Sequence, residues 1–381
     1  MRTRVVGWAP SAPAMRLVLL LLTSLVVSLA GCDSAPDPPE TNECTPVAST
    51  NGQVGEWEFL GLGGEDIGDI SAIAVSPCDP RVIYAGSSAD FSGGIPGRIF
   101  KSTDGGATWD TLFTGSTQGG GVSDIEVDPH DPKTVYALPG GVIKSTDGGQ
   151  TWQDLSEDLE IPTEDTRALV LEVDPTNPKI LYLGATGFFG GALYKTDNGG
   201  AEWKVLGQDV ARLDGVASVT VSPKNPATVY VGAGSGDLFK STDGGQTWEL
   251  TGLRRTRLDV QDVSIDAQQP NRLYAAVEEN GIMTSKDGGA TWQSLNEGLP
   301  ENGLVVEVEK STKELFLVHA HEDSGQVYRR EESLESVWSS YGVDSLEGQS
   351  HYSSSLQLMA EARSLYFGLN GVYRVKLATR E

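Results

Sequence analysis

Three arginines are the most distinctive group of side chains that could bind a ligand. Arg254, Arg255 and Arg257 lie within four residues, in a chain whose formal net charge is −25. A guanidinium can donate two parallel hydrogen bonds to a carboxylate. The cluster therefore predicts a site for a carboxylate or an acidic peptide. Pairing with local acids such as Asp259 is the structural alternative.

A pair of histidines raises the question of a metal site. His319 and His321 are followed by Glu322 and Asp323. Residues i and i+2 of an extended strand point to one side, so the two imidazoles could share a metal with a carboxylate. The spacing fixes no third ligand. We therefore expect polar surface histidines and neither a bound metal nor a cofactor.

Aromatic residues in expected loops form a further candidate surface. Phe188 and Phe189 stand beside glycines, and three other residues share this kind of position: Phe91, Tyr341 and Tyr352. Exposed rings could stack on sugars or hold a peptide, whereas rings under long loops often serve only packing. Both interpretations stay open.

Acidic residues in the same loops could support glycoside hydrolysis. That reaction needs two carboxyl groups roughly 5–9.5 Å apart. Many residues qualify: Asp66, Asp69, Glu164, Asp165, Asp214, Glu278 and Glu279. Because no pair stands out, we assign no catalytic residue.

The overall composition restricts the partners. Lys and Arg number 28 and Asp and Glu number 53, which argues against nucleic acid and against a basic membrane-binding surface. The chain also contains 46 Gly and 19 Pro, which indicates many tight turns. A turn-rich globular protein with an apolar core is therefore expected.

The N-terminal segment has the features of a secretion signal. Residues 17–29 form a largely apolar run behind Arg16 and are shorter than the roughly 20 residues that span a bilayer. Leu29-Ala30-Gly31-Cys32 follows and resembles the bacterial lipobox. The resemblance implies a signal peptide over 1–31 and a lipid on Cys32, which would anchor the protein to a membrane of the bacterial cell envelope. An ordinary secretory signal is the alternative. The membrane leaflet and the start codon, Met1 or Met15, stay open.

The next segment lacks the apolar residues needed to fold. Residues 32–54 are rich in Pro and acidic residues, which predicts a semi-extended tether. Cys44 and Cys78 could form a disulfide in an oxidising compartment, and two free thiols are the alternative.

The rest of the chain is built from internal repeats. K-S-T-D-G-G-A-T-W ends at Trp109, and related copies end at Trp152, Trp203, Trp248 and Trp292, with a degenerate copy at Trp338. Successive copies lie 43 to 51 residues apart. A period of this length with several short strands is typical of β-propeller blades. Each unit contains an alternating first strand, a Pro turn, a V-x-Y second strand, a third strand and a Trp-led fourth strand.

Counting the first strands predicts seven blades. They begin near Ser71, Ser123, Leu169, Ala217, Gln261, Leu304 and Ser355. The last unit lacks its fourth strand, whereas Trp57–Leu60 is an extra strand before the first unit. We therefore predict an all-β, seven-bladed propeller over residues 55–381. Its four-stranded antiparallel blades would form a ring that closes when Trp57–Leu60 pairs with Val372–Lys376.

The repeated motif resembles the Asp-box (BNR) repeat, S-x-D-x-G-x-T-W. This family includes sialidases, the sortilin ectodomain, xyloglucan-degrading glycoside hydrolases and a photosystem II assembly factor. The resemblance implies the propeller fold and says little about function.

We expect a structural role for the boxes. Each offers one carboxylate (Asp104, Asp147, Asp243 or Asp287, with Asn198 in the third copy), whereas a calcium loop needs several oxygen ligands. The carboxylate should accept hydrogen bonds from its own turn, the glycines should adopt positive φ, and the tryptophan should be a buried ring.

The sequence favours a binding protein over an enzyme. We expect a monomeric scaffold that presents loops to a protein, a peptide or a glycan, on the face opposite the box turns. The alternative is a glycoside hydrolase of the xyloglucanase or sialidase kind. However, Arg98-Ile99-Phe100 lacks the proline of the sialidase Arg-Ile-Pro motif.

Overall fold

A computed structural model describes residues 56–377, apart from residues 65, 91–93, 116–119, 158, 160–166, 188–189, 207–214, 254–258, 279, 301–303, 311–313, 322–323, 332–335, 342–345, 348–354, 360–362 and 369. The chain divides into two compact units, Met1–Thr41 and Asn42–Glu381, and every described residue belongs to the second. The predicted signal peptide (1–31) and tether (32–54), with Cys32 and Cys44, lie outside the described residues.

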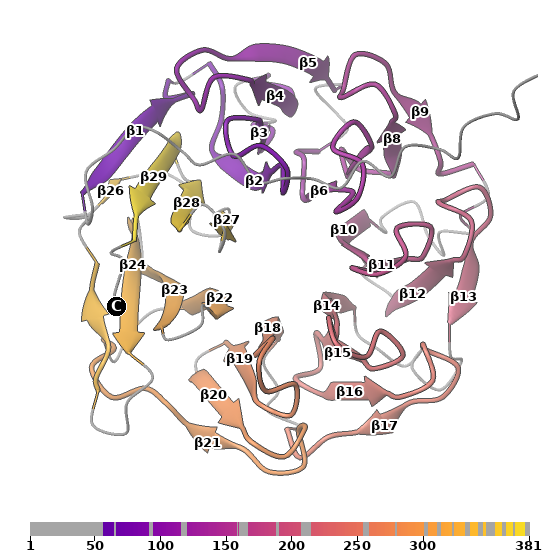
Figure 1. The fold of residues 1–381 in the computed structure, drawn as a ribbon, viewed down its shortest axis with the longest axis vertical. Coiled ribbons are helices and arrows are strands. Elements are labelled where there is room, and N and C mark those ends of the chain that lie inside the picture. The colour runs from indigo at the N-terminus through magenta and orange to yellow at the C-terminus, as the bar shows by residue number, and fades with distance from the viewer. Residues whose placement is uncertain are drawn as a thin grey trace, which may run out of the picture. The chain divides into compact units, whose positions relative to one another are not determined.

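The described elements are strands in seven antiparallel sheets, which confirms the predicted seven-bladed propeller. Figure 1 shows them around a ring, each with its first strand innermost. Blade 1 contains β2 (Ile70–Val75), β3 (Ile83–Ser87), β4 (Arg98–Ser102) and β5 (Asp110–Thr114). Blade 2 contains β6 (Ile125–Val127), β7 (Val135–Ala137), β8 (Ile143–Ser145) and β9 (Gln153–Asp154). Blade 3 contains β10 (Arg167–Val173), β11 (Leu181–Gly187), β12 (Gly190–Thr196) and β13 (Lys204–Leu206).

The remaining blades repeat this order. Blade 4 contains β14 (Val216–Val221), β15 (Val229–Ala233), β16 (Leu238–Ser241) and β17 (Glu249–Leu250). Blade 5 contains β18 (Val260–Ile265), β19 (Leu273–Val277), β20 (Gly281–Ser285) and β21 (Gln293–Ser294). Blade 6 contains β22 (Leu304–Lys310), β23 (Glu314–His321), β24 (Ser324–Glu331) and β25 (Ser339–Ser340), with β26 (Leu346–Glu347) also paired to β24. Blade 7 contains β27 (Ser355–Met359), β28 (Ser364–Gly368), β29 (Val372–Lys376) and β1 (Trp57–Gly61).

Blade 7 joins the two ends of the described chain. β1 pairs antiparallel with β29, with Trp57 opposite Val375 and Phe59 opposite Tyr373. The pairing predicted between Trp57–Leu60 and Val372–Lys376 is therefore confirmed. The side chain of Leu60, at the inward end of β1, is only 7% exposed.

The hydrophobic core is divided among the interfaces between neighbouring sheets. The cluster between blades 1 and 2, for example, joins Tyr84 and Ile99 to Ile125 and Val135. The second-strand tyrosines are among the largest fully buried side chains: Tyr84, Tyr136, Tyr182, Tyr230, Tyr274 and Tyr366. Each blade is thus stabilised mainly by apolar surface that it buries against the next. No described helix is long and apolar enough to cross a membrane.

Candidate functional site

The Asp-box turns are closed networks of hydrogen bonds. In blade 2, Asp147 accepts hydrogen bonds from the backbone N–H and hydroxyl of Thr151, at 2.9 and 2.6 Å, and from the hydroxyl of Ser145 at 2.8 Å. These bonds, the Thr151 hydroxyl foremost, lower the pKa of Asp147 to about 2. The same bonds form at Asp104, Asp243 and Asp287. The box carboxylates therefore bind their own turns, as expected.

The other box positions fit this role with one difference from expectation. Gly148 and Gly149 have φ of 75° and 91°, which a side chain would strain. Asn198 replaces the aspartate in blade 3 and still accepts the Glu202 backbone N–H at 3.0 Å. The tryptophan rings of the five intact boxes are half-buried rather than fully buried, because each lies at the outer part of its blade.

A tyrosine and a lysine join each of several blades to the box turn of the next. In blade 1, the Tyr84 hydroxyl and Lys101 Nζ both donate to the carbonyl oxygen of Gly148 in blade 2, at 3.3 and 2.7 Å. The ammonium also lies 5.1 Å from the Tyr84 ring centre, within the range of a cation–π contact. Burial raises the pKa of Tyr84 to about 12, so its hydroxyl remains a proton donor. We call this arrangement the tyrosine–lysine clamp.

The clamp recurs around the ring. In blades 3 and 4, Tyr182 with Lys195 and Tyr230 with Lys240 donate to the first box glycine of the following blade. In blade 2, Lys144 donates to the Gly199 carbonyl. In blade 7, Arg374 takes the place of the lysine, reaching the Gly105 carbonyl at 3.4 Å and Glu58 at 2.6 Å.

Blade 5 departs from this pattern. Thr284 occupies the position of the clamp lysine. A cation instead comes from Arg272, whose guanidinium carbon lies 5.6 Å from the Tyr274 ring centre. The position of Arg272 is held in the preceding blades by an uncharged residue: Val82, Thr134, Ile180 or Thr228. Lys286 is likewise a new cation within the box, where the earlier copies have Thr103, Thr146, Asp197 and Thr242.

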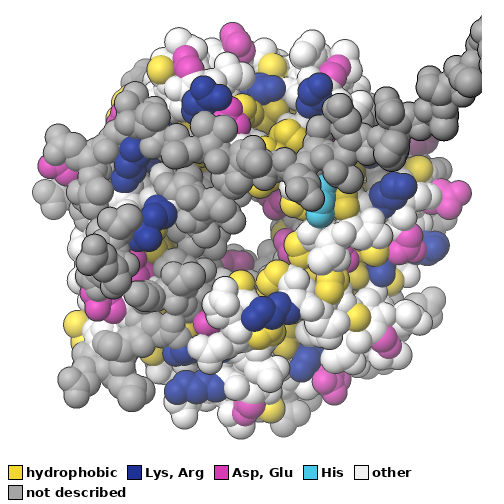
Figure 2. Space-filling model, viewed as in Figure 1, with side chains coloured by type: hydrophobic (Ala, Val, Ile, Leu, Met, Phe, Trp, Pro, Cys, Tyr) yellow, Lys and Arg dark blue, Asp and Glu magenta, His cyan; other side chains and the backbone are white. Residues whose placement is uncertain are grey.

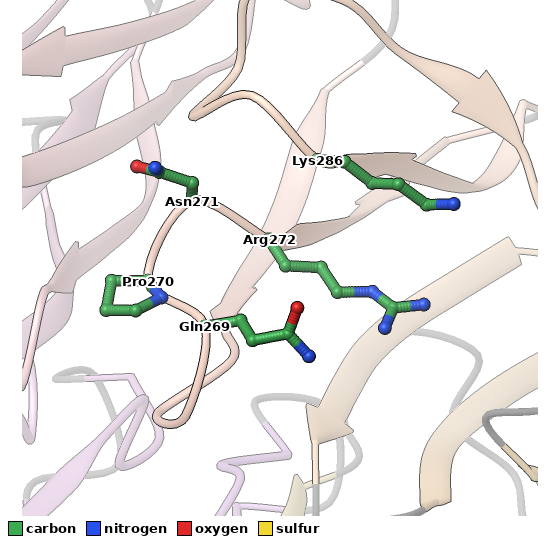
Figure 3. Close-up of a pocket in the computed structure, with 5 residues that line it drawn as sticks. All are labelled: Gln269, Pro270, Asn271, Arg272 and Lys286. Carbon is green, nitrogen blue, oxygen red and sulfur yellow. The ribbon is translucent and has the colours of Figure 1, made fainter.

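These two cations border a cavity. It has a volume of about 410 Å³ and is lined by Gln269, Pro270, Asn271, Arg272 and Lys286. Figure 3 shows Gln269, Arg272 and Lys286 extending to the same side of the turn. Antiparallel order places this turn, between β18 and β19, at the same end of the blade as the box turn between β20 and β21. The cavity therefore lies on the box face, not on the opposite face where we expected ligands.

Carboxyl groups on the inner strands form a second polar feature. Asp124 accepts the Leu171 backbone N–H at 2.7 Å, and Glu172 accepts the Val221 backbone N–H at 2.9 Å. Each carboxyl thus links its inner strand to that of the next blade. Burial raises the pKa of both groups, and neighbouring carboxylates raise that of Glu172 further. Among the described residues no group of three or more His, Cys, Asp or Glu could hold a metal ion.

Most binding residues predicted from the sequence remain without a structural test. Arg254, Arg255 and Arg257, and also Phe188 and Phe189, lie outside the described residues. Those sites stay predictions.

The two histidines are placed only by their backbone. His319 and His321 belong to β23, where they pair with Gln326 and Ser324 of β24, so they stand on a strand that is shared with blade 6's other elements. Their possible metal role stays untested.

Two other expectations receive partial answers. Cys78 is disulfide-bonded, but its partner lies outside the described residues, so the bridge to Cys44 stays a prediction. Tyr341 packs edge-on against Trp57 and Phe316, with ring centres 6.4 and 5.8 Å away. This ring therefore serves packing.

No large cationic surface gathers on the face that Figure 2 shows. The described Lys and Arg side chains there are separated from one another, with Asp and Glu among them, and the ring is hollow at its centre. The cavity beside Arg272 and Lys286 is thus a local concentration of positive charge.

Comparisons with known proteins agree with this fold. The family model described as "Sortilin, neurotensin receptor 3" matches residues 191–361. No curated protein matches the sequence.

Solved structures share the fold at low sequence identity. The structure of YCF48 bound to D1 peptide is 16% identical, with a TM-score of 0.61, and the match covers 88% of this chain and 99% of that one. YCF48 from Cyanidioschyzon merolae is 14% identical, with a TM-score of 0.60 and coverage of 84% and 99%. An ancestral GH74 enzyme is 19% identical, with a TM-score of 0.52, and the match covers 65% of this chain.

The chain spans about a third of that GH74 enzyme, since the match covers 34% of its length. At these identities the likeness concerns the fold alone. The described residues form a seven-bladed propeller of Asp-box repeats, similar in fold to the YCF48 and GH74 propellers and, over residues 191–361, to the sortilin family.

Proposed function

We propose that this protein is a lipid-anchored scaffold of the bacterial cell envelope whose propeller binds a protein partner through a peptide segment. The observation that carries the proposal is the extent of the likeness to YCF48. That protein is matched over 99% of its length, and its structure contains a bound D1 peptide. A propeller of this size therefore suffices to hold a peptide.

The closed box turns support a binding role. Their carboxylates are occupied by their own turns, so the repeats supply a rigid frame and leave recognition to the residues that vary between blades. Rigid scaffolds that display variable segments lose little conformational entropy on binding.

Glycoside hydrolysis is the second candidate, because a GH74 enzyme shares the fold with a TM-score of 0.52. This chain covers only 34% of that enzyme. Turnover of a glycoside panel by the full chain would support the enzyme. Absence of turnover, together with capture of a protein, would support the scaffold.

Partner capture tests the binding role. The full chain is crosslinked in cells and its partners are identified, with Arg254→Ala/Arg255→Ala/Arg257→Ala as the test variant. A matched control removes three exposed cations from equivalent turns of blades 1 to 3: Arg81, Lys133 and Lys179. We expect capture to fall in the test variant only. Equal capture by both variants would exclude the arginine cluster, and absence of any specific partner would contradict the scaffold.

Anchoring is tested separately. Cys32→Ser should move the protein from the membrane fraction to the soluble fraction and abolish incorporation of labelled fatty acid. Unchanged membrane association of this variant would contradict lipidation at Cys32.

A further inference from the structure

The junction between blades 5 and 6 has the donors of a clamp without its acceptor. In blades 1, 3 and 4 the second-strand tyrosine donates to a glycine carbonyl of the next box. Blade 6 carries only a degenerate box with no Gly-Gly pair. The Tyr274 side chain is 0% exposed, and its hydroxyl has no hydrogen-bond partner among the described residues. A buried donor left in this state costs free energy.

The cavity lies beside this hydroxyl. Arg272 lines the cavity and stacks on the Tyr274 ring, so the tyrosine stands directly behind the guanidinium. Stacking uses the flat face of a guanidinium, whereas hydrogen bonds to a carboxylate use the N–H groups in its plane. The aromatic contact therefore holds the guanidinium in an orientation suited to binding.

Two independent departures from the repeat bring positive charge to this cavity. The position of Arg272 is uncharged in blades 1 to 4, and Lys286 replaces a threonine or an aspartate of the earlier boxes. The nearby carboxylate of Asp266 accepts the backbone N–H groups of Gln268 and Gln269, at 2.8 and 3.1 Å, and so fixes the turn that carries Arg272. The repeat alone would need neither cation.

We propose that the cavity bordered by Arg272 and Lys286, with the Tyr274 hydroxyl behind it, binds a carboxylate of an acidic peptide. This proposal rests on the proposed function and names a site for it. The peptide oxygen would take the place of the glycine carbonyl that blade 6 does not supply. The guanidinium would give planar hydrogen bonds, and the Lys286 ammonium would add a second positive charge.

The size and surroundings of the cavity favour a peptide over a small anion or a nucleic acid. A volume of about 410 Å³ is in the range of ligand sites, roughly 300–1,000 Å³, and would hold an amino-acid residue or two. Pro270 adds an apolar wall, and the amides of Gln269 and Asn271 can bond to a peptide backbone. A nucleic acid would be repelled by a chain of net charge −25.

Binding of labelled peptides to the full chain tests the site. The probes are an amidated hexapeptide containing two glutamates, the same peptide with two glutamines, and the glutamine peptide with a free C-terminal carboxylate. Fluorescence anisotropy at low salt gives each Kd. We expect the first or the third probe to bind, and the amidated glutamine peptide to bind at least about tenfold more weakly. Which of the two binds distinguishes a side-chain carboxylate from a chain end.

Variants based on the other blades locate the site. Arg272→Thr/Lys286→Thr restores residues that blade 4 has at these positions, Thr228 and Thr242, so the fold should tolerate it. We expect its Kd for the carboxylate probe to rise about tenfold or more. The control Lys133→Thr/Lys179→Thr removes two exposed cations from the same face and should leave the Kd unchanged. Equal effects of the two variants would overturn the proposal, because they would indicate general charge attraction.

Tyr274→Phe separates the hydroxyl from the charges. It removes one oxygen from a buried ring and should weaken carboxylate binding by about threefold or more without lowering the melting temperature. Unchanged binding by this variant would remove the hydroxyl from the site. Inorganic phosphate that binds where all three peptides fail would overturn the peptide assignment. Full partner capture by Arg272→Thr/Lys286→Thr would refute this site while leaving the proposed function intact.

Discussion

Closure of the ring by β1 can be tested with a single core substitution. Leu60 belongs to the cluster between blades 7 and 1, together with Ile70, Tyr366 and Val372. Its side chain is 7% exposed, and a Cβ placed on Gly106 of the first box would lie 2.6 Å from the Leu60 Cβ. Leu60 therefore fills the space between the closing strand and blade 1.

We expect Leu60→Ala to destabilise the protein by about 3 kcal/mol. Leucine-to-alanine changes in packed cores cost about 2–5 kcal/mol, because the lost burial is joined by the cost of a cavity. For a domain of this size, such a loss lowers the melting temperature by about 5–10 °C. Urea unfolding followed by tryptophan fluorescence would give the free energy of unfolding, and a thermal scan would give the temperature.

The matched control lies next to Leu60 on the same strand. The side chain of Phe59 is 54% exposed and mainly contacts Tyr373, with ring centres 5.2 Å apart. Phe59→Ala should therefore cost only about 1 kcal/mol. If Phe59→Ala destabilised the protein as much as Leu60→Ala, or if Leu60→Ala had no effect, the inner face of β1 would not seal the ring.

Three further predictions concern the turns and the inner strands. Asp147→Asn should lower the melting temperature at pH 7, and the wild-type advantage should disappear as the pH falls from the ordinary aspartate pKa toward about 2, where Asp147 itself is protonated. Differential scanning fluorimetry across that range checks this, and the box with Asn198 should contribute no such dependence. Burial raises the pKa of Glu172 above its ordinary value of 4.5, so its contribution to stability is largest below that pH and declines as the pH rises; Glu172→Gln should flatten this decline in melting curves between pH 5 and 9. Gly149→Ala should cost about 2 kcal/mol or more in urea unfolding, because φ is 91° and the new Cβ would lie 2.3 Å from Leu112 Cδ1; an unchanged midpoint would show that the turn can relax.

The fold could be predicted because its signals are local and repeated. Each box contains a polar turn and a tryptophan within nine residues, and each second strand contains a buried tyrosine or, in blade 6, Phe316. The closing strand followed from one surplus strand before the first unit and one missing strand after the last. Pairing of Trp57 with Val375 needed no information beyond this count.

The cavity could not be predicted in the same way. Arg272 and Lys286 are 14 residues apart, and each alone has the features of an ordinary surface cation. Their meaning depends on the clamp, which joins Tyr84 to Gly148 across 64 residues and has no local signature. Comparing the copies position by position would have marked both residues as departures, although it would not have shown that they meet.

Irregular pairing also escaped the sequence. The inner strands shift register at similar places, between Ile70 and Ala72 and between Val260 and Asp262 for example. Such bulges depend on how a strand twists against its neighbour, and alternation of apolar residues does not record them.

The shared sheet of β1 and β29 has a consequence for the order of the chain. Residues Trp57 and Val375 are direct partners, so a short linker could join the two ends. New ends could then be opened in a turn between any two blades without removing a strand from its sheet. A circular permutant made in this way should keep the same seven wedges, because the ring records only which blade follows which and not where translation begins.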